Sequence, residues 1–353
     1  MKPRQHIIAA VLALCLLFTA CGGNQNGSEP AALSGPTAYT SDVTALDLPI
    51  TELTASGVCG RALYLAGMEE SPTEQSGEDE ISGSFSFSSS TSDDGGYTVY
   101  SGGGKAVLYR MDAVSGEVVK LAGYTPGDGA SVTALVPCGD GTIWVLEQTG
   151  ADLGSLDLSD GESGGIFSAS PENFGAAGRQ VWRKLDATGE QEMDRVDLTE
   201  LAQKLGVETV TDTRMDEENH LYAAAGSTVA VLDTSLSFLF TCKGQETVGR
   251  LISLADGSVG AVTGSGESCT VYSVDLDGQT LGNACPLTGN VGRIYTGNEE
   301  YSFFYTSGDS LYGWSGETAS PEKMLSWSGA GLDKGQVEAL AFLPDGQAAA
   351  LLR

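Results

Sequence analysis

The stretch from Val132 to Leu146, VTALVPCGDGTIWVL, decides the fold of this chain. It consists of a short apolar strand, a turn at Gly139-Asp140-Gly141 and a second apolar strand. Glycine and aspartate supply the positive φ angles that tight hairpin turns require. Trp144 follows the turn, where a large residue is expected to pack in the core. The stretch therefore predicts a β-hairpin.

The same phrase occurs five times along the chain. Each copy joins two apolar strands through a turn rich in Asp, Glu, Asn or Gly; the other copies are Val210–Ala224, Val248–Val262, Val291–Phe304 and Val337–Leu351. The starts of successive copies are 78, 38, 43 and 46 residues apart, and the first gap contains a long polar segment. A second hairpin usually follows, as at Val181–Asp186 and Thr270–Leu276. Four short strands therefore recur about every forty residues.

This period is typical of β-propellers, whose four-stranded blades bury their faces only by stacking on neighbours. The predicted fold class is all-β, a β-propeller-like repeat of four-stranded blades over residues 46–353. A β-sandwich is the alternative, but it would not show five similar phrases. The last copy ends halfway through a blade. Either Val58–Leu65 and the strands after it complete the ring, or the natural chain continues past Arg353, which we favour.

Two segments interrupt the repeats. Residues 68–96 and 149–180 are rich in Gly, Ser and acidic residues and too poor in apolar residues to form a core, so we expect long surface loops. Between two blades, Asp197–Gly206 has leucines at helical spacing, a residue that can cap and a glycine that can terminate. This pattern predicts a short helix that decorates the ring.

The N-terminus has the pattern of an export signal. Lys2 and Arg4 precede the apolar run Ile7–Phe18, which is too short to cross a bilayer as a helix of ~20 residues. Phe18-Thr19-Ala20-Cys21 resembles the lipobox of bacterial lipoproteins, although Phe18 departs from the usual aliphatic residue. We expect residues 1–20 to be a lipoprotein signal peptide, Cys21 to be lipidated and residues 21–45 to be a flexible tether. An ordinary signal peptide with a chance cysteine is the alternative.

The charge of the chain excludes one class of partner. The formal net charge is −29 at pH 7, and nucleic acids bind through clustered Lys and Arg. We therefore expect no nucleic-acid partner. The location expected is extracytoplasmic, on the cell membrane through the lipid anchor, which two or more acyl chains make stable.

The cysteines give no metal pattern. Without Cys15 in the signal and Cys21 at the anchor, five are left: Cys59, Cys138, Cys242, Cys269 and Cys285. No C-x-x-C pair occurs, and the spacings fit no zinc site. A bridge between Cys242 and Cys269 is conceivable, but we favour small buried thiols.

No residue stands out as catalytic, cofactor-binding or metal-binding, so the sequence predicts no enzyme and no cofactor. His220, the one histidine after the signal, sits beside a turn, and Asp275-Leu276-Asp277-Gly278 begins like a calcium loop but lacks its later ligands. The four tryptophans could stack on a sugar, but Trp144 and Trp182 lie in strand phrases and are expected in the core.

The second half of the chain resembles a known family. The series Ile294–Gly297, Phe304–Thr306, Leu311–Trp314, Met324–Trp327 and Phe342–Gly346 is similar to the N-terminal propeller-like region of clostridial lipoproteins that carry extracellular solute-binding domains of ABC importers. The lipobox, the tether and Leu48-Pro49 fit the same layout. The two-lobed α/β binding domain of those proteins is absent from this sequence.

The resemblance implies a non-catalytic, surface-anchored propeller that assists solute capture for an ABC importer. The expected partners are the membrane, through the lipid, and a small-molecule solute or an importer component. A protein-interaction scaffold of the cell envelope is the alternative, and an enzyme would need convergent polar residues at the ring centre.

Overall fold

The computed structural model describes most of the repeat region and parts of the N-terminus. The described residues are 7–13, 40–46, 50, 52–70, 85–87, 99–101, 104–127, 129–149, 179–276, 279–316, 320–329, 337–342 and 348–352. They form six four-stranded antiparallel sheets and one two-stranded sheet, with very little helix. The predicted all-β propeller of four-stranded blades is confirmed.

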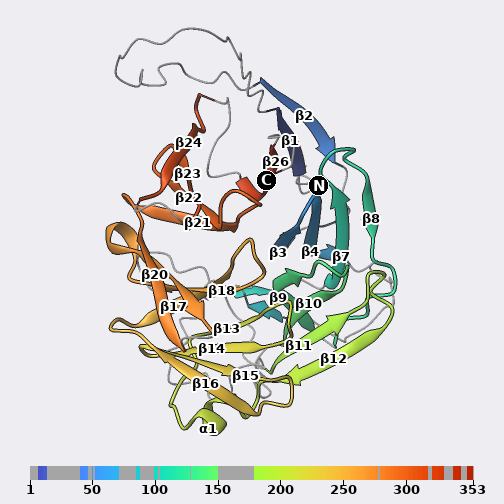
Figure 1. The fold of residues 1–353 in the computed structure, drawn as a ribbon. Coiled ribbons are helices and arrows are strands. Elements are labelled where there is room, and N and C mark those ends of the chain that lie inside the picture. The colour runs from blue at the N-terminus through green and yellow to red at the C-terminus, as the bar shows by residue number, and fades with distance from the viewer. Residues whose placement is uncertain are drawn as a thin grey trace, which may run out of the picture.

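Five blades consist of strands in chain order, with the first strand innermost in the ring (Figure 1). Blade 1 consists of β3 (Glu52–Cys59), β4 (Ala62–Glu70), β7 (Gly104–Asp112) and β8 (Val118–Lys120). Blade 2 consists of β9 (Ala130–Pro137), β10 (Ile143–Thr149), β11 (Gln180–Leu185) and β12 (Glu192–Asp197). Blade 3 consists of β13 (Asp212–Met215), β14 (Leu221–Ala225), β15 (Thr228–Leu232) and β16 (Phe238–Lys243). Blade 4 consists of β17 (Val248–Ser253), β18 (Val259–Thr263), β19 (Thr270–Asp275) and β20 (Thr280–Pro286). Blade 5 is β21 (Val291–Thr296), β22 (Phe303–Ser307), β23 (Ser310–Trp314), β24 (Glu322–Ser326).

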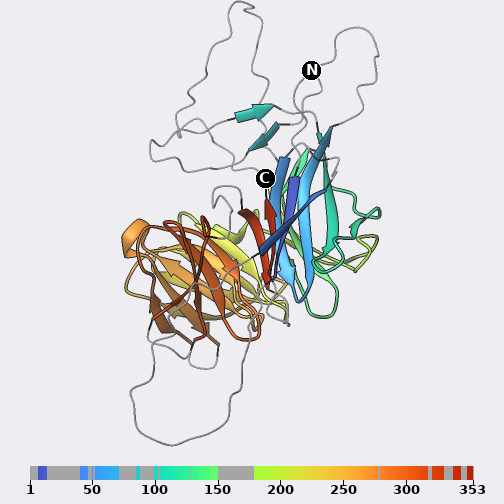
Figure 2. The same ribbon diagram turned by 90° about the horizontal axis from the view of Figure 1, so that it is seen from above.

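The sixth blade joins the two ends of the chain. Its inner strands, β25 (Val337–Phe342) and β26 (Ala348–Leu352), pair outwards with β1 (Ile7–Ala13) and β2 (Thr40–Leu46). Figures 1 and 2 show these N-terminal strands beside the C-terminal ones. Val58–Leu65 lies in β3 and β4 of blade 1, which packs against blade 6 through Leu63, Leu65 and Ala341. This segment therefore belongs to the ring, whereas β1 and β2 complete the last blade.

The N-terminal strands overlap two predicted segments. β1 lies in the apolar run that we interpret as a signal peptide, and β2 begins within residues 21–45, the predicted tether. An uncleaved apolar run of this composition can serve as a strand, so the signal peptide stays a prediction. The predicted lipidation site, Cys21, lies outside the described residues.

The predicted loops and helix lie between strands. Residues 71–84, 88–96 and 150–178 of the predicted loops lie outside the described residues, whereas β5 (Phe85–Phe87) and β6 (Val99–Ser101) form a small hairpin. The predicted helix is confirmed as α1 (Leu201–Leu205), which ends at Gly206 with φ 66°. Asp197 does not cap this helix; it accepts hydrogen bonds from Thr199 and pairs with Arg179. A short 3₁₀ helix covers Gly266–Ser268.

The core lies between the blades. Six buried apolar clusters occur, and each combines residues of two adjacent blades. Trp144 and Trp182 of blade 2 are fully buried against Met215 and Leu221 of blade 3, as the hairpin phrase predicts. Burying a large apolar side chain stabilises the fold by ~1.5–3 kcal/mol. Each blade is therefore held mainly by its two neighbours, and the clusters run around the whole ring.

Asp and Asn side chains fix the turns of the phrase. The carboxylate of Asp140 accepts hydrogen bonds from the Thr142 amide and hydroxyl, at 2.9 and 2.6 Å. Asp256 holds Ser258 in the same way, at 3.0 and 2.6 Å. These acceptors satisfy turn N–H groups that no strand partner reaches. The turns that follow the innermost strands consequently form one defined rim of the ring.

Candidate functional site on the ring axis

The innermost strands share an irregularity that determines what faces the ring axis. In five of them the pairing register shifts by at least one residue at the second position of the phrase. The residues left without an opposite partner are Thr54, Thr133, Gly249, Gly292 with Arg293, and Glu338. In blade 3, Thr211 and Asp212 both oppose Ala224. Such a bulge bends the strand and redirects its side chains.

Polar groups at these positions link neighbouring inner strands. The carboxylate of Asp212 accepts a hydrogen bond from the Leu251 backbone amide at 2.7 Å. The Arg214 guanidinium donates through Nε to Ser253 Oγ at 2.9 Å, so two bonds join β13 to β17. Between blades 5 and 6, Arg293 Nη1 donates to the Val337 carbonyl at 3.2 Å. The inner edge strands thus gain partners from adjacent blades.

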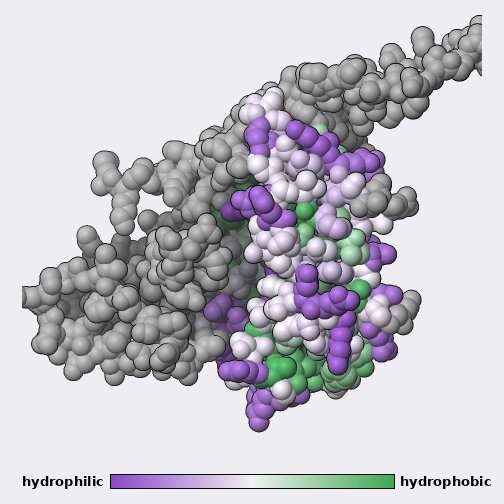
Figure 3. All heavy atoms as spheres, turned by 90° about the vertical axis from the view of Figure 1, so that its left-hand side faces the viewer, coloured by the Kyte–Doolittle hydropathy of each residue, from purple (hydrophilic) through white to green (hydrophobic). Residues whose placement is uncertain are grey.

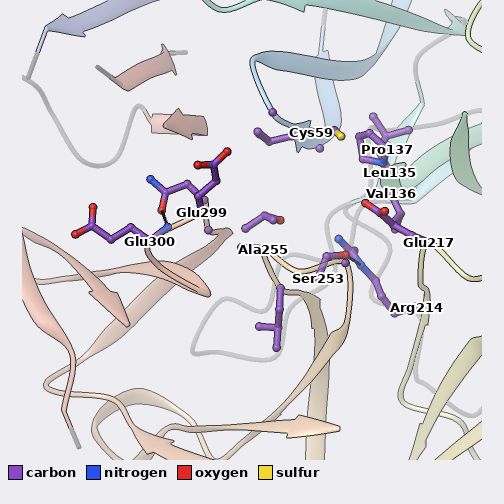
Figure 4. A pocket seen from close by; sticks show the side chains of 18 residues that line it. Cys59, Leu135, Val136, Pro137, Arg214, Glu217, Ser253, Ala255, Glu299 and Glu300 are labelled. Carbon is purple, nitrogen blue, oxygen red and sulfur yellow. Dashed lines mark hydrogen bonds between the residues drawn. The ribbon is translucent and has the colours of Figure 1, made fainter. Parts of the chain in front are cut away.

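A cavity of about 330 Å³ lies at the rim end of the axis. Residues from the inner strands of five blades, and from the turns that follow them, line it (Figure 4). Gly57 and Cys59 come from blade 1, and Ser253 comes from blade 4. Small-molecule sites are usually cavities of this kind, with a few convergent polar groups.

The cationic group in this cavity is Arg214. Burial lowers the pKa of Arg214, and the carboxylate of Asp212 opposes that effect while Arg250 adds to it. The side chain stays charged, as arginine does in proteins. Among the described residues, Ser253 is the hydrogen-bond partner found for its guanidinium, through Nε. The terminal nitrogens can therefore donate to an occupant of the cavity.

The neighbouring carboxylate, Asp212, is itself perturbed. Burial raises the pKa of Asp212, while the Leu251 amide, Arg214 and Arg250 oppose the rise. Arg214 and Arg250 therefore both favour the charged form of this carboxylate.

The rim of the cavity carries the opposite charge. Glu217 lies on the Arg214 side and Glu299 lies across the cavity, each at the turn after an innermost strand (Figure 4). No ion pair involving either carboxylate occurs among the described residues. Glu217 lies against Gly257, where a Cβ atom would come within 3.0 Å of Glu217 Cδ and φ is +80°. Glycine is thus required beside this carboxylate.

The Cys59 thiol also lines the cavity but is not activated. Burial raises its pKa, and the carboxylates of Glu217 and Asp140 add to the rise. The thiolate is the nucleophilic form of cysteine, so at neutral pH this thiol is a poor nucleophile. The other four described cysteines are buried, and all five are free thiols, as favoured from the sequence.

The structure does not bring the other candidate residues together. His220 Nδ1 lies 2.9 Å from the buried Asp216 carboxylate, which also accepts from Tyr222, so it is part of a turn. Asp275 ends β19, whose pairing with β20 favours a hairpin over a calcium loop; residues 277–278 lie outside the described residues. All four tryptophans are buried, so none presents a face to a sugar.

No group of three or more His, Cys, Asp or Glu side chains in the described ranges is placed to hold a metal ion. None of the helices in the same ranges has the length and hydropathy of a membrane span.

Sequence reasoning missed Arg214, Glu217 and Ser253 as site residues. The available signal was charge inside the innermost strands, where Asp212, Arg214, Arg250 and Arg293 interrupt apolar phrases. Buried strands rarely carry charges unless they are paired or functional. The bulges that turn these positions to the axis leave no mark in the hydrophobic pattern.

Comparison with known proteins gives no family. No protein-family model matches the sequence, and no curated protein matches it. Similar solved structures include a protein of unknown function from Bacteroides caccae, with TM-score 0.39 and 10% identity over 97% of this chain and 92% of that one. A luciferin-regenerating enzyme has TM-score 0.42 and 8% identity, over 86% and 92% of the chains. Hydrazine synthase from Kuenenia stuttgartiensis has TM-score 0.35 and 12% identity, over 76% of this chain and 57% of that one. No function is transferred from likenesses this weak.

Proposed function

We propose that this chain is a non-catalytic, surface-anchored propeller module that captures a small polar solute on its ring axis and assists an ABC importer. The observation that carries the capture is the cavity of about 330 Å³, which residues of five blades line and whose polar side chains include Arg214, Glu217 and Ser253. The importer and the lipid anchor rest on the sequence resemblance.

The capture is tested by thermal unfolding of the full chain with a panel of sugars, organic acids and amino acids. A ligand that binds only the folded state stabilises it by ~2.7 kcal/mol at one hundred times its Kd. We expect at least one solute to raise the Tm, to bind with one-to-one stoichiometry in calorimetry, and to be recovered unchanged. A panel in which no solute binds contradicts solute capture, and a converted solute contradicts the non-catalytic role.

The importer role has its own test. Permease genes beside the coding sequence, or an open reading frame that runs on into a two-lobed binding domain, are expected. Envelope-assembly genes in their place would contradict the importer role and favour a scaffold.

A protein-interaction scaffold is the second candidate, and one observation favours it. The outermost strand β16 exposes Phe238 and Leu239, at 58% and 45% of their surface. Figure 3 shows the side of the molecule that lies at the left of Figure 1, where hydrophobic residues gather at the lower end and much of the rest is of intermediate hydropathy or hydrophilic. Exposed apolar groups of this kind mark contact sites when they are contiguous. A photo-crosslinker at position 238 should then yield a protein adduct in cells, whereas one at Gln245 should not.

A further inference from the structure

The two ends of the axial cavity differ in charge, and this difference defines a ligand. The inner end has Arg214, with terminal nitrogens available. The rim end has Glu217 and Glu299, with no described cation paired to either. An occupant with one sign of charge would face repulsion at one end.

We infer that the axial cavity binds a zwitterion, with a carboxylate on Arg214 and an ammonium group between Glu217 and Glu299. Arginine is suited to a carboxylate because its planar fork donates parallel hydrogen bonds. Carboxylates at the rim are acceptors for the three N–H donors of an ammonium group. The ligand class is therefore an amino acid or a similar small molecule with both groups.

The local geometry keeps the Arg214 guanidinium and the Glu217 carboxylate apart. Arg214 and Glu217 lie on the same hairpin, but they form no ion pair within 4.0 Å. Arg214 is directed toward blade 4 by its bond to Ser253. Glu217 is placed against Gly257, beside Gly139 of blade 2, whose Cβ position lies 3.4 Å from Glu217 Oε2. A ligand can thus bridge charges that the protein keeps separate.

The inference rests on the proposed solute capture, and the size of the cavity fits it. A volume of about 330 Å³ is at the small end of ligand sites, which span ~300–1,000 Å³. The surrounding backbone is close-packed, since a Cβ atom at Gly57 would lie 2.6 Å from Pro137 Cδ. A small solute is therefore favoured over a polymer.

Titration calorimetry of the full chain tests the ligand class. The probes are the proteinogenic α-amino acids, 4-aminobutyrate and 6-aminohexanoate, followed by the N-acetyl and carboxamide derivatives of the tightest binder. We expect one or more zwitterions to bind and both derivatives to bind about tenfold more weakly or worse, as loss of ~1.4 kcal/mol implies. Derivatives that bind as tightly as the parent would overturn the inference.

Three variants locate the charges. R214Q should weaken zwitterion binding by about 10- to 100-fold, since a hydrogen bond to a charged group contributes ~1.5–3 kcal/mol. E217Q, on the exposed rim, should weaken binding of the zwitterion and of its carboxamide derivative, which keeps the ammonium group. The residual binding of the N-acetyl derivative, which lacks that group, should change less. E218Q is the matched control, because Glu218 is the next residue but does not line the cavity, and it should bind as the parent does.

The outcomes separate the inference from the proposed function. Should R214Q unfold, E217Q and the ligand derivatives still decide the matter. Binding of a neutral sugar, independent of Arg214, keeps solute capture and overturns the zwitterion. Absence of binding by every solute overturns both.

Discussion

Gly57 shows how single residues shape the axis. It lies on β3, where that strand passes β9 most closely, and a Cβ atom there would meet Pro137 Cδ at 2.6 Å and the Leu135 carbonyl at 3.1 Å. The contact includes backbone, which cannot move aside as a side chain can. The wall of the cavity between blades 1 and 2 therefore requires glycine.

We predict that Gly57→Ala destabilises the chain by ~1–3 kcal/mol, the usual cost of overpacking. Gly249→Ala is the matched control, because it lies on the innermost strand β17 and its Cβ atom would meet the Val262 carbonyl only at 4.0 Å. Urea unfolding monitored by tryptophan fluorescence measures both. Equal stability of the two variants would contradict the close approach.

At the scale of elements, three hairpins between the third and fourth strands of a blade use the same turn. Asp112, Asp186 and Asp233 each accept hydrogen bonds from the residues of their own turns. The hydrogen bonds from Arg61 lower the pKa of Asp112, and the hydroxyl of Ser235 lowers the pKa of Asp233. For Asp186, desolvation opposes the shift, but hydrogen bonds within its turn outweigh it.

These shifts predict an acid-dependent loss of stability. A carboxyl group whose folded pKa is lowered contributes stability above its unfolded pKa, which is about 3.9 for aspartate, and loses it as pH falls through the folded value. The triple variant D112N/D186N/D233N keeps one acceptor oxygen at each position and removes the charge. We expect it to be less stable than the parent at pH 7, with the difference shrinking below about pH 4. A difference that is the same at both pH values, in urea unfolding, would contradict this.

At the scale of elements, the sequence predicted most of the innermost strands but not the polar residues of the cavity. The five phrases predicted ten strands correctly, because apolar runs around Asp/Gly turns are a local signal. The phrase in blade 1 was missed, since Leu53-Thr54-Ala55 runs on to a short turn at Gly60 without an aspartate. The polar wall of the cavity was missed too, since the bulges and the juxtaposition of Arg214 with Ser253 depend on pairing between distant segments.

At the scale of the whole molecule, the ring closes through contacts between the chain ends. β26 pairs with β1, and Ala341 of blade 6 packs in a cluster with Leu63 and Leu65 of blade 1. Neither contact is local in sequence, so the sequence pattern did not identify β1 and β2 as the strands that complete the sixth blade. The segment Ile7–Ala13 therefore has two competing uses, as an export signal and as a strand.

Lipidation at Cys21 decides between these two roles, because it requires removal of residues 1–20, which include Ile7–Ala13. We predict that cells fed an alkyne-labelled fatty acid label the parent chain, and that the mature N-terminus is Cys21. C21S should lose the label and the membrane association, since acyl chains provide the binding. Intact-mass analysis that finds Met1–Ala20 retained would contradict the lipoprotein prediction and assign Ile7–Ala13 to the sixth blade.

The measurement that tests the axial site most directly is the alkylation rate of Cys59, followed by peptide mapping. Cys59 lines the cavity and is the one described cysteine that is not buried. We predict that a saturating zwitterion slows the alkylation of Cys59 in the parent chain, and that the same concentration gives no protection in R214Q. An unchanged Cys59 rate while calorimetry shows the solute bound would place the ligand elsewhere and contradict the axial site.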